Sequence, residues 1–456
     1  MTIGGRMGPV LLFAGDIAVF ALSLWLTLFV RYGAAPSWNL FADHFGPFLI
    51  LFAIWILIFF MSGLYEKGII FFQKNLSDAL LKTQFLNIVL AALFFFVIPY
   101  FGITPKTILA IYLGVSLALI FFWRLVVFPK LSRRRMRQEA LLIGNGTEVD
   151  ELFVEVNGNS RYPVHFERVI DPASPTYKEE LGETLRNTQA ELVVVDVEND
   201  SIQPFLPVIY GRAFVRKEIQ FADFHQLYEE VFDRVPLSLL RYEWFLKNIS
   251  HPTFGLHTLI KRILDIVGGV AMGLVVATIL PLVFVAMRIE GKGPLFIKQE
   301  RIGQHGTRMR AYKFRSMRRD KAASHEWTVE EKRDNPITRV GALLRRTSLD
   351  EFPQFINVLK GEISLIGPRN DIEGLGKRLG EEIPYYSVRY VVKPGITGWA
   401  QINQKYEPGN ISPQSIKETR VRLAYDFYYI KNRSLILDLV IALKTIKRML
   451  FRVSNI

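Results

Sequence analysis

The chain has 456 residues, enough for two or three domains, and its 56 Lys and Arg against 43 Asp and Glu give a net charge of +13. Half of its residues are hydrophobic, which is high for a soluble protein, so acidic lipid or phosphorylated ligands explain the positive charge better than nucleic acid, and we expect no nucleic-acid partner. Because cysteine is absent, disulfides, thiolate nucleophiles and cysteine-ligated zinc are excluded.

Four apolar runs fill the first third of the chain, each close to the roughly 20 residues that a helix needs to cross about 30 Å of hydrocarbon. A cleavable signal peptide is the alternative for the first run, but this run is too long and further apolar runs follow. We therefore predict four transmembrane helices within residues 1–130. The runs are 9–30, 46–65, 80–101 and 107–128.

Basic residues gather in the loops on one side of these predicted spans, and an excess of Lys and Arg marks cytoplasmic loops. Both ends of the bundle are therefore expected in the cytoplasm. Asp16, inside the first run, is either functional or a helix-packing group, and Pro99 and Pro105 break the helices near the outer side. The basic residues on the cytoplasmic side are Arg6, Lys67, Lys74, Lys82 and those of segment 130–137, whereas the other loops carry Arg31 and Lys106.

The composition changes to that of a soluble α/β domain over residues 138–250. Residues 139–153 predict a buried strand, a glycine turn and a helix, and residues 190–198 predict another buried strand. Gly144 and Gly146 fill two positions of a dinucleotide-binding fingerprint, but Val149 stands where the third glycine belongs. Two interpretations stay open, a working nucleotide site and a degenerate Rossmann-like module that regulates or assembles.

A further apolar run occupies residues 261–290 and is long enough to span a membrane. Pro281 lies inside it and removes a helical hydrogen bond, and Gly268, Gly269 and Gly273 weaken the helix further. Basic residues stand at both ends of the run rather than at one. We predict a helix that bends and returns to the same face of the membrane, with a fifth spanning helix as the alternative.

Clusters of Arg and Lys follow this run, and fixed cations of this kind hold phosphate or diphosphate groups. A solvated surface or attraction to lipid headgroups is the alternative, and it is our interpretation of Arg318 and Arg319. The cations that could bind phosphate are Lys313, Arg315, Arg345, Arg346 and Arg369.

Asp350 and Glu351 are adjacent carboxylates among these cations. Such a pair can bind Mg²⁺ through hard oxygen ligands, and one member can act as a nucleophile on phosphorus. Ser348 and Glu351 also match a helix-capping box, which would make both acids structural. Pro353 fits that box poorly, and a helix that starts nearer Pro353 would leave the acids at its mouth. On the residues alone the catalytic and structural interpretations both remain open.

Five stretches of the C-terminal part resemble a known family in the family's own order: KFRSM, ITRVG, LRRTSLDEFPQFINVLKGEISLIGPR, KPGITGWAQIN and YDFYYIKNRSLILDL. The family is that of the bacterial polyprenyl-phosphate glycosyl-1-phosphate transferases, monotopic enzymes that start exopolysaccharide, O-antigen and glycoprotein glycan assembly. The predicted spans and the middle domain resemble its long members. The implied fold is a four-helix transmembrane bundle, a Rossmann-like middle domain and a monotopic catalytic domain with a re-entrant membrane helix.

The resemblance implies a role for each matching residue. Asp350 matches the nucleophile that attacks a UDP-sugar, expels UMP and carries the sugar phosphate until polyprenyl phosphate takes it up. Glu351 matches its partner in catalysis and, with Asp350, in binding Mg²⁺. Three cations match phosphate-binding positions, and Pro281 matches the break of the re-entrant helix. The three cations are Lys313, Arg345 and Arg369.

Three positions depart from the family pattern. Asn370 replaces a proline, which we expect to relax the loop that carries Arg369. Phe352 replaces leucine and stays apolar, and Leu280 replaces a serine at the helix break of some members.

The sequence thus predicts a multi-pass protein of the bacterial inner membrane, with domains at 1–130, 138–250 and 256–456 and its catalytic domain on the cytoplasmic face. Its expected partners are a UDP-sugar, polyprenyl phosphate and membrane lipid, with a homodimer as a further expectation. A catalytically silent scaffold or regulator of polysaccharide assembly is the alternative function. A multi-span transporter is disfavoured by the large soluble part of the chain.

Overall fold

The structure is a computed structural model that divides into two compact units, Met1–Val231 and Phe232–Ile456. Each unit is described by itself. The structure describes residues 7–62, 64–65, 76–97, 105–132, 138–159, 162, 164–187, 190–216, 218–249, 255–317, 337–406 and 413–454.

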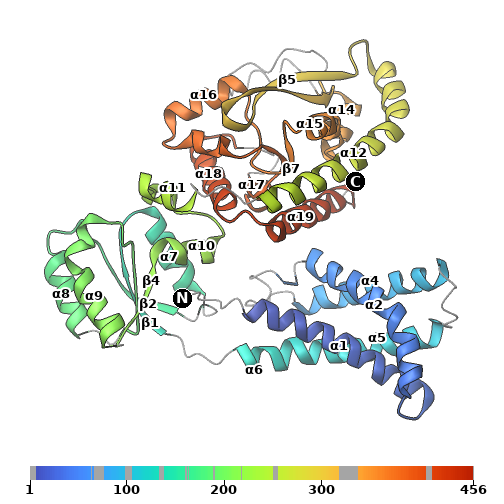
Figure 1. The fold of residues 1–456 in the computed structure, drawn as a ribbon, viewed down its shortest axis with the longest axis horizontal. Coiled ribbons are helices and arrows are strands. Elements are labelled where there is room, and N and C mark those ends of the chain that lie inside the picture. Colours follow the sequence, from blue (N-terminus) through green and yellow to red (C-terminus); the bar gives the residue numbers. More distant parts are fainter. Residues whose placement is uncertain are drawn as a thin grey trace. The chain divides into compact units, whose positions relative to one another are not determined.

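The N-terminal part forms long apolar helices, as predicted (Figure 1). Three of them are long and apolar enough to cross a membrane, over Val10–Tyr32, Trp38–Met61 and Thr107–Val127. Their shared core is aromatic, with Phe20, Trp55 and Tyr112 fully buried. The helices are α1 (Met7–Tyr32), α2 (Trp38–Met61), α4 (Leu76–Val97) and α5 (Pro105–Phe122), which continues through a π-helical turn (Trp123–Val127) into α6 (Phe128–Ser132).

The third predicted span corresponds to α4, whose described apolar part, Thr83–Phe96, is shorter than the other three. Residues 98–101 of this span, including its proline at 99, lie outside the described residues, as do Arg6, Lys67, Lys74, the basic residues 133–137 and Arg318 and Arg319.

Asp16 is a packing group of the helices, the second of its two predicted roles. The Nε of Arg124 donates to its Oδ1 at 3.1 Å, and the hydroxyl of Tyr65 donates to its Oδ2 at 2.6 Å. Asp16 and Arg124 are both buried, so this ion pair ties α1 to the π-helical turn that follows α5 inside the bundle.

A parallel sheet with strand order β2-β1-β3-β4 follows. The prediction of a strand, a glycine turn and a helix over residues 139–153 is confirmed by β1 and α7. The predicted buried strand over residues 190–198 is confirmed by β3. Val149 packs where the fingerprint has its third glycine, and its Cγ2 lies 3.0 Å from where a Cβ on Gly144 would stand. Figure 1 shows α8 and α9 on one side of the sheet and α7 on the other. The elements are β1 (Gln138–Ile143), α7 (Thr147–Gly158), β2 (Val164–Ile170), α8 (Tyr177–Asn187), β3 (Leu192–Val195), α9 (Leu206–Tyr210), β4 (Gln220–Asp223) and α10 (Phe224–Phe232).

The second unit begins before the predicted boundary at 250–256. The backbone N–H of Val235 donates to the carbonyl of Ala424, and the indole of Trp399 donates to the carbonyl of Asp233, so residues 232–249 pack on this unit's core. Its elements are α11 (Tyr242–Asn248), α12 (Gly255–Glu290), β5 (Phe296–Ile302), β6 (Arg308–Phe314), α14 (Arg339–Arg346), the 3-10 helix η7 (Leu349–Gln354), α15 (Phe355–Lys360), β7 (Ser364–Ile366), α16 (Glu373–Glu382), the 3-10 helix η8 (Tyr386–Val391), β8 (Gly395–Thr397), α17 (Trp399–Asn403), α18 (Ile416–Lys431) and α19 (Leu435–Ser454).

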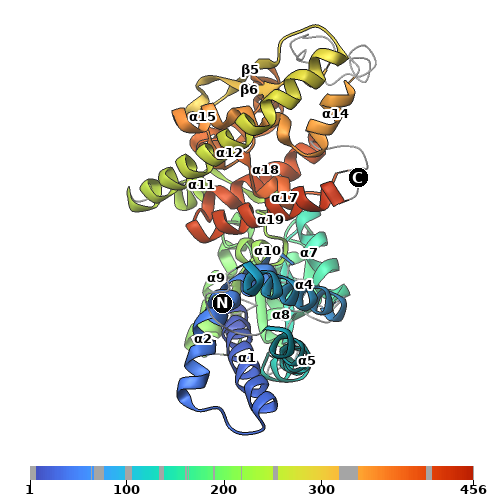
Figure 2. The same ribbon diagram turned by 90° about the vertical axis from the view of Figure 1, so that its right-hand side faces the viewer.

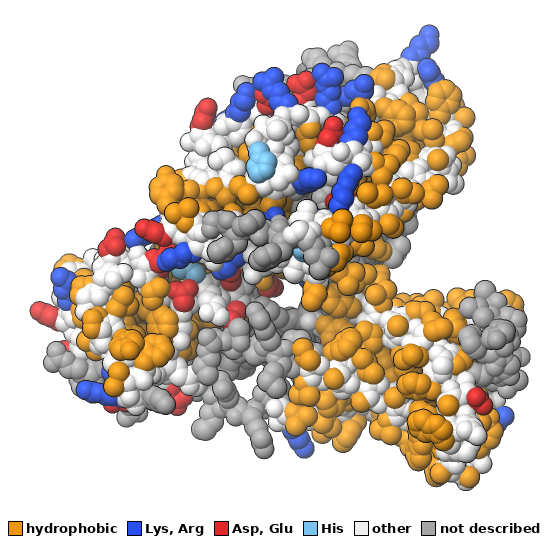
Figure 3. All heavy atoms as spheres, viewed as in Figure 1, with side chains coloured by type: hydrophobic (Ala, Val, Ile, Leu, Met, Phe, Trp, Pro, Cys, Tyr) orange, Lys and Arg blue, Asp and Glu red, His pale blue; other side chains and the backbone are white. Residues whose placement is uncertain are grey.

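The predicted membrane segment forms α12, a single continuous helix of 36 residues that includes Pro281. It is apolar and long enough to span, and only 17% of its apolar window is buried inside the protein. The ribbon changes direction along its length in Figure 1, and hydrophobic side chains cover its exposed side in Figure 3. The re-entrant path remains a prediction.

The glycines of α12 serve close packing. A Cβ on Gly268 would stand 2.3 Å from Leu365 Cδ1, and one on Gly273 would stand 3.1 Å from the ring of Phe355. Figures 1 and 2 both show α12 beside α15, the short helix that follows the candidate catalytic acids. The glycines thus let an otherwise exposed helix approach the site.

Polar contacts fix the first turns of α12 to the same region. Arg262 donates to the carbonyls of Val358 and Leu359 at 2.6 and 2.7 Å, and these belong to the last turn of α15. Asp265 Oδ1 accepts from the hydroxyl of Ser364 and the N–H of Leu365, both at 2.9 Å. The bonds from Arg262 satisfy carbonyls that the end of α15 leaves unpaired, and Asp265 binds donors at the start of β7.

Candidate active site

Asp350 and Glu351 lie in the first turn of η7, immediately before α15. The predicted capping box is wrong, because Ser348 has a left-handed backbone (φ 58°) and its side chain makes no capping hydrogen bond. This conformation reverses the chain after α14, and the acids start the next helical segment. The α-helix begins only at Phe355, after Pro353, and both acids stand in the 3-10 helix that precedes it.

Glu351 is clamped between two cations. Lys313 Nζ donates to its Oε1 at 2.7 Å, while Arg369 donates to Oε1 at 2.5 Å and to Oε2 at 3.2 Å. Burial opposes ionisation of this carboxyl, but Arg369 and Lys313 outweigh burial and hold the pKa of Glu351 well below its usual range. Glu351 is therefore a fixed anion.

Asp350 has different surroundings. Within the described residues no side chain or backbone group donates a hydrogen bond to its carboxylate. Burial raises the pKa of Asp350, the adjacent Glu351 carboxylate raises it further, and the nearby cations Lys313, Arg345 and Arg369 oppose both effects. An anion with no donor of its own, surrounded by cations, is well placed to approach an electrophilic phosphorus.

Arg345 reaches this site from the last turn of α14. Its Nε donates to the hydroxyl of Ser316 at 2.9 Å, which orients the guanidinium. Helix α14 is itself capped, since Thr338 accepts from the N–H of Gly341 and Glu290 of α12 accepts from the N–H of Val340. The end of α12 and the start of α14 are therefore joined.

A buried ionic network positions Arg369, and sequence reasoning missed it. Asp371 accepts from Arg389 and, at 2.7 Å, from Arg422, and Arg389 donates to the carbonyl of Arg369 at 2.8 Å. Arg301 donates to the carbonyl of Asn370 at 3.1 Å. The segment that carries Arg369 is thus fixed from several sides, not relaxed by the loss of proline at 370. In the sequence this network is marked only by Asp371 and by Tyr386 and Arg389 of the YYSVRY segment. These residues show no spacing that is typical of a site.

The predicted site residues Lys313, Arg345, Asp350, Glu351 and Arg369 therefore come together, from β6, α14, η7 and the segment after β7. Pro281 lies within α12, and its neighbours Leu280 and Val283 pack in one apolar cluster with Phe352, next to the acids. Two of the predicted phosphate ligands, Lys313 and Arg369, are engaged with Glu351.

The donor set suits a weakly held Mg²⁺. The described residues contain no group of three acids or histidines that could enclose a metal ion. Mg²⁺ commonly takes one or two carboxylates and completes its shell with water and substrate phosphate. Among the described residues, none engages the oxygens of Asp350 and only Arg369 donates to Glu351 Oε2, so the two carboxylates fit this limited role.

Comparison with known proteins gives the family. The model of the bacterial sugar transferases matches residues 256–452. The exopolysaccharide production protein PSS of Rhizobium leguminosarum bv. phaseoli is 38% identical over 190 residues, which make up 41% of this chain and 93% of that protein. The chain belongs to the bacterial sugar transferase family.

Two longer relatives carry names that state an activity. A UDP-N-acetylgalactosamine-undecaprenyl-phosphate N-acetylgalactosaminephosphotransferase of Aeromonas hydrophila is 38% identical over 195 residues, 43% of this chain and 44% of that protein. An undecaprenyl-phosphate glucose phosphotransferase of Komagataeibacter xylinus is 30% identical over 336 residues, 71% of this chain and 61% of that protein. The chain thus spans less than two thirds of both. The five clustered residues lie within the part that matches the sugar transferase family.

Proposed function

We propose that this chain transfers a sugar 1-phosphate from a UDP-sugar to polyprenyl phosphate, as the initiating step of exopolysaccharide, O-antigen or glycan synthesis. The observation that carries the proposal is the asymmetric pair of acids. Asp350 has no hydrogen-bond donor among the described residues, whereas Glu351 is clamped by Lys313 and Arg369. The names of the relatives from Aeromonas and Komagataeibacter support the same reaction class.

In the first half-reaction an oxygen of Asp350 forms a bond to the phosphorus that bears the sugar. The bond from that phosphorus to the oxygen bridging the two phosphates breaks, and UMP leaves with that oxygen. Arg345 and the Lys313 and Arg369 cations supply positive charge where negative charge develops, which is the main requirement of phosphoryl transfer.

In the second half-reaction a phosphate oxygen of the polyprenyl phosphate attacks the same phosphorus. The bond to Asp350 breaks, the free carboxylate returns, and the product is a polyprenyl-diphospho-sugar. A covalent step divides one transfer between a soluble and a lipid substrate into two, so the two substrates need not be bound together.

Mg²⁺ is the cofactor that we propose, held by Asp350 and Glu351 together with the donor diphosphate. When bound, it would neutralise charge on the phosphate oxygens. Glu351 stays ionised because Lys313 and Arg369 bind it. The same two bonds fix the orientation of its carboxylate and so the direction in which it could bind a metal ion.

The membrane arrangement is part of the proposal. The four candidate spans support association with a membrane, and we place the protein in the bacterial inner membrane with the catalytic unit on the cytoplasmic face. In this proposal α12 enters one leaflet, bends at Pro281 and turns back to the same side. The site then lies at the depth of the lipid headgroups, where the lipid phosphate is. A homodimer remains a proposal.

Replacing Asp350 with Asn tests the mechanism. The Asp350→Asn variant should lose UMP release by at least about a thousand-fold, because the amide is not a nucleophile. The wild-type chain, given UDP-sugar labelled in the sugar, should become labelled and lose the label when polyprenyl phosphate is added. Glu300→Gln, an equally conservative change on exposed β5, is the control and should keep wild-type turnover.

Full activity of Asp350→Asn would refute the covalent mechanism. Absence of UMP release from the wild-type chain with every UDP-sugar, with Mg²⁺ and lipid phosphate present, would instead favour a silent scaffold.

A further inference from the structure

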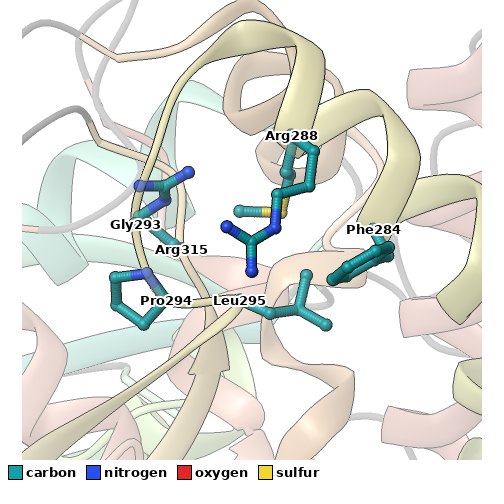
Figure 4. Close-up of a pocket in the computed structure, with 7 residues that line it drawn as sticks. Phe284, Arg288, Gly293, Pro294, Leu295 and Arg315 are labelled. Atoms are coloured by element: carbon teal, nitrogen blue, oxygen red, sulfur yellow. The ribbon is translucent and has the colours of Figure 1, made fainter.

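A small hollow lies at the C-terminal end of α12 (Figure 4). Two arginines face it, Arg288 from α12 and Arg315 from the end of β6, and its apolar wall includes Phe284 and Leu295. About 200 Å³ of space, open to solvent, lies between them. The hollow is shallow and open to solvent, so it can receive one group of a larger ligand but cannot enclose a nucleotide sugar.

Arg315 is built into the wall. It is 6% exposed, and its guanidinium donates to the carbonyls of Lys292 and Gly291 at 2.9 and 3.3 Å. Its Nε is buried and has no hydrogen-bond partner among the described residues. A Cβ on Gly293 (φ 151°) would stand 1.6 Å from the Arg315 side chain, so glycine is needed for this approach. The result is a buried cation in the wall of the hollow, with one N–H that no described residue engages.

Arg288 supplies the second cation. Its guanidinium lies over the ring of Phe284, 5.2 Å from the ring centre, and it points across the hollow in Figure 4. Within the described part of the chain it makes no hydrogen bond or ion pair. An arginine held by an aromatic ring keeps its donors available for an anion.

The surface around the hollow is apolar. Leu282 is 75% exposed and Ile289 is 83% exposed, and both lie on α12 near the hollow. In Figure 3 hydrophobic side chains cover this end of the second unit, with Lys and Arg at its border. A site that combines two arginines with an apolar approach matches a phosphate group on a hydrocarbon chain.

The hollow is close to the catalytic acids along β6. Lys313, which binds Glu351, and Arg315 are two residues apart, and Arg315 continues the ladder because its N–H donates to the carbonyl of Leu295. Residues two apart on a strand share a face and lie about 7 Å apart. Ser316, the next residue, accepts the hydrogen bond from Arg345.

We propose that Arg288 and Arg315 bind the phosphate of the polyprenyl-phosphate acceptor, with its first isoprene units against Phe284 and the exposed side of α12. This inference rests on the proposed function and deepens it, because it gives the acceptor a site distinct from that of the donor diphosphate.

The test compares Arg288→Gln and Arg288→Lys with the wild-type chain in lipid. Arg288→Gln should raise the KM for polyprenyl phosphate about ten-fold, and Arg288→Lys should raise it less because it keeps the charge. Labelling by UDP-sugar in the absence of polyprenyl phosphate should proceed at the wild-type rate in both variants. Arg310→Gln, an exposed arginine on β6 away from the hollow, is the matched control and should leave the KM unchanged.

A direct binding measurement makes the test independent of catalysis. A fluorescent short-chain isoprenyl phosphate should bind the wild-type chain about ten-fold more tightly than Arg288→Gln, and neither inorganic phosphate nor vesicles with phosphatidic acid should displace it at equal concentration.

Equal affinity of the two chains for the probe would overturn the proposal, and so would displacement by inorganic phosphate or by phosphatidic acid. If the wild-type chain binds the probe through Arg288 but is never labelled by a UDP-sugar, the proposed function fails and the phosphate site stands.

Discussion

Asp350 and Glu351 are neighbours in the chain with opposite electrostatic surroundings. Two cations lower the pKa of Glu351, whereas burial and the charge of Glu351 raise that of Asp350. Glu351 therefore keeps its charge at every physiological pH, and Asp350 is the acid whose charge changes as the medium is acidified. The pH dependence of the reaction should report on Asp350.

Activity should fall as the pH decreases through the raised pKa of Asp350, because only the carboxylate can attack phosphorus. Arg345 lowers that pKa, so Arg345→Gln should raise it and move the acidic limb of the pH–rate profile to higher pH. The measurement is the rate of labelling by UDP-sugar against pH. Arg310→Gln should leave the limb in place, and an unmoved limb in Arg345→Gln would contradict the assignment.

The acids and their cations were predictable as candidates, because adjacent carboxylates among Arg and Lys stand out in the sequence. Their different environments were not predictable. The pairing of Glu351 with Lys313, 38 residues earlier, depends on the β5–β6 hairpin, and the support of Arg369 by Arg389 depends on η8. Long-range pairings of this kind have no local pattern.

At the level of elements, glycines decide how closely helices approach the site. In α16, a Cβ on Gly376 would stand 2.4 Å from Ile302 Cδ1 and 2.7 Å from the hydroxyl of Tyr390, which binds Asp371. A Cβ on Gly380 of the same helix would have no atom of the described residues within 4 Å. The two glycines form a matched pair.

Gly376→Ala should destabilise the second unit by about 1–3 kcal/mol, because the added methyl group overpacks the Asp371 network. Gly380→Ala should stabilise it by up to about 1 kcal/mol, because alanine favours the helix and meets open space. Chemical denaturation in detergent measures both. Activity should also drop in Gly376→Ala alone, since Arg369 depends on that network, and equal effects of the two changes would refute this account.

Local patterns predicted some elements well and failed at one decisive place. The lengths of the apolar runs correctly gave the helices of the bundle, and short apolar runs gave the buried strands β1 and β3. The S-x-x-E pattern at Ser348 predicted a cap, but the chain turns there through a left-handed residue. Nothing in the residue type signals this turn, because serine rarely adopts that conformation.

For the whole molecule, the path of α12 determines on which side of the membrane the catalytic unit lies. The sequence placed the apolar segments, and the structure gives α12 as one helix, but the choice between a spanning and a re-entrant path depends on lipid. Neither residue periodicity nor packing within the chain contains that information.

The absence of cysteine makes the path testable, because any introduced thiol is unique. Gly255→Cys and Lys292→Cys flank α12, and on the re-entrant path both should react with an impermeant maleimide only after the cytoplasmic side is opened. Ala35→Cys, between α1 and α2, should react from the outside and serves as the control. Labelling of Gly255→Cys and Lys292→Cys from opposite sides would show that α12 spans.

The bonds from Arg262 to the end of α15 attach the membrane helix to the catalytic segment without a flexible joint. The acids of η7 therefore follow α12 wherever the lipid holds it. A hydrophobic helix adjusts its depth and tilt to the thickness of the hydrocarbon around it. We therefore expect bilayer thickness to affect the position of the acids relative to the lipid phosphate. We expect the lipid composition that surrounds the protein to change its turnover even when every substrate is in excess.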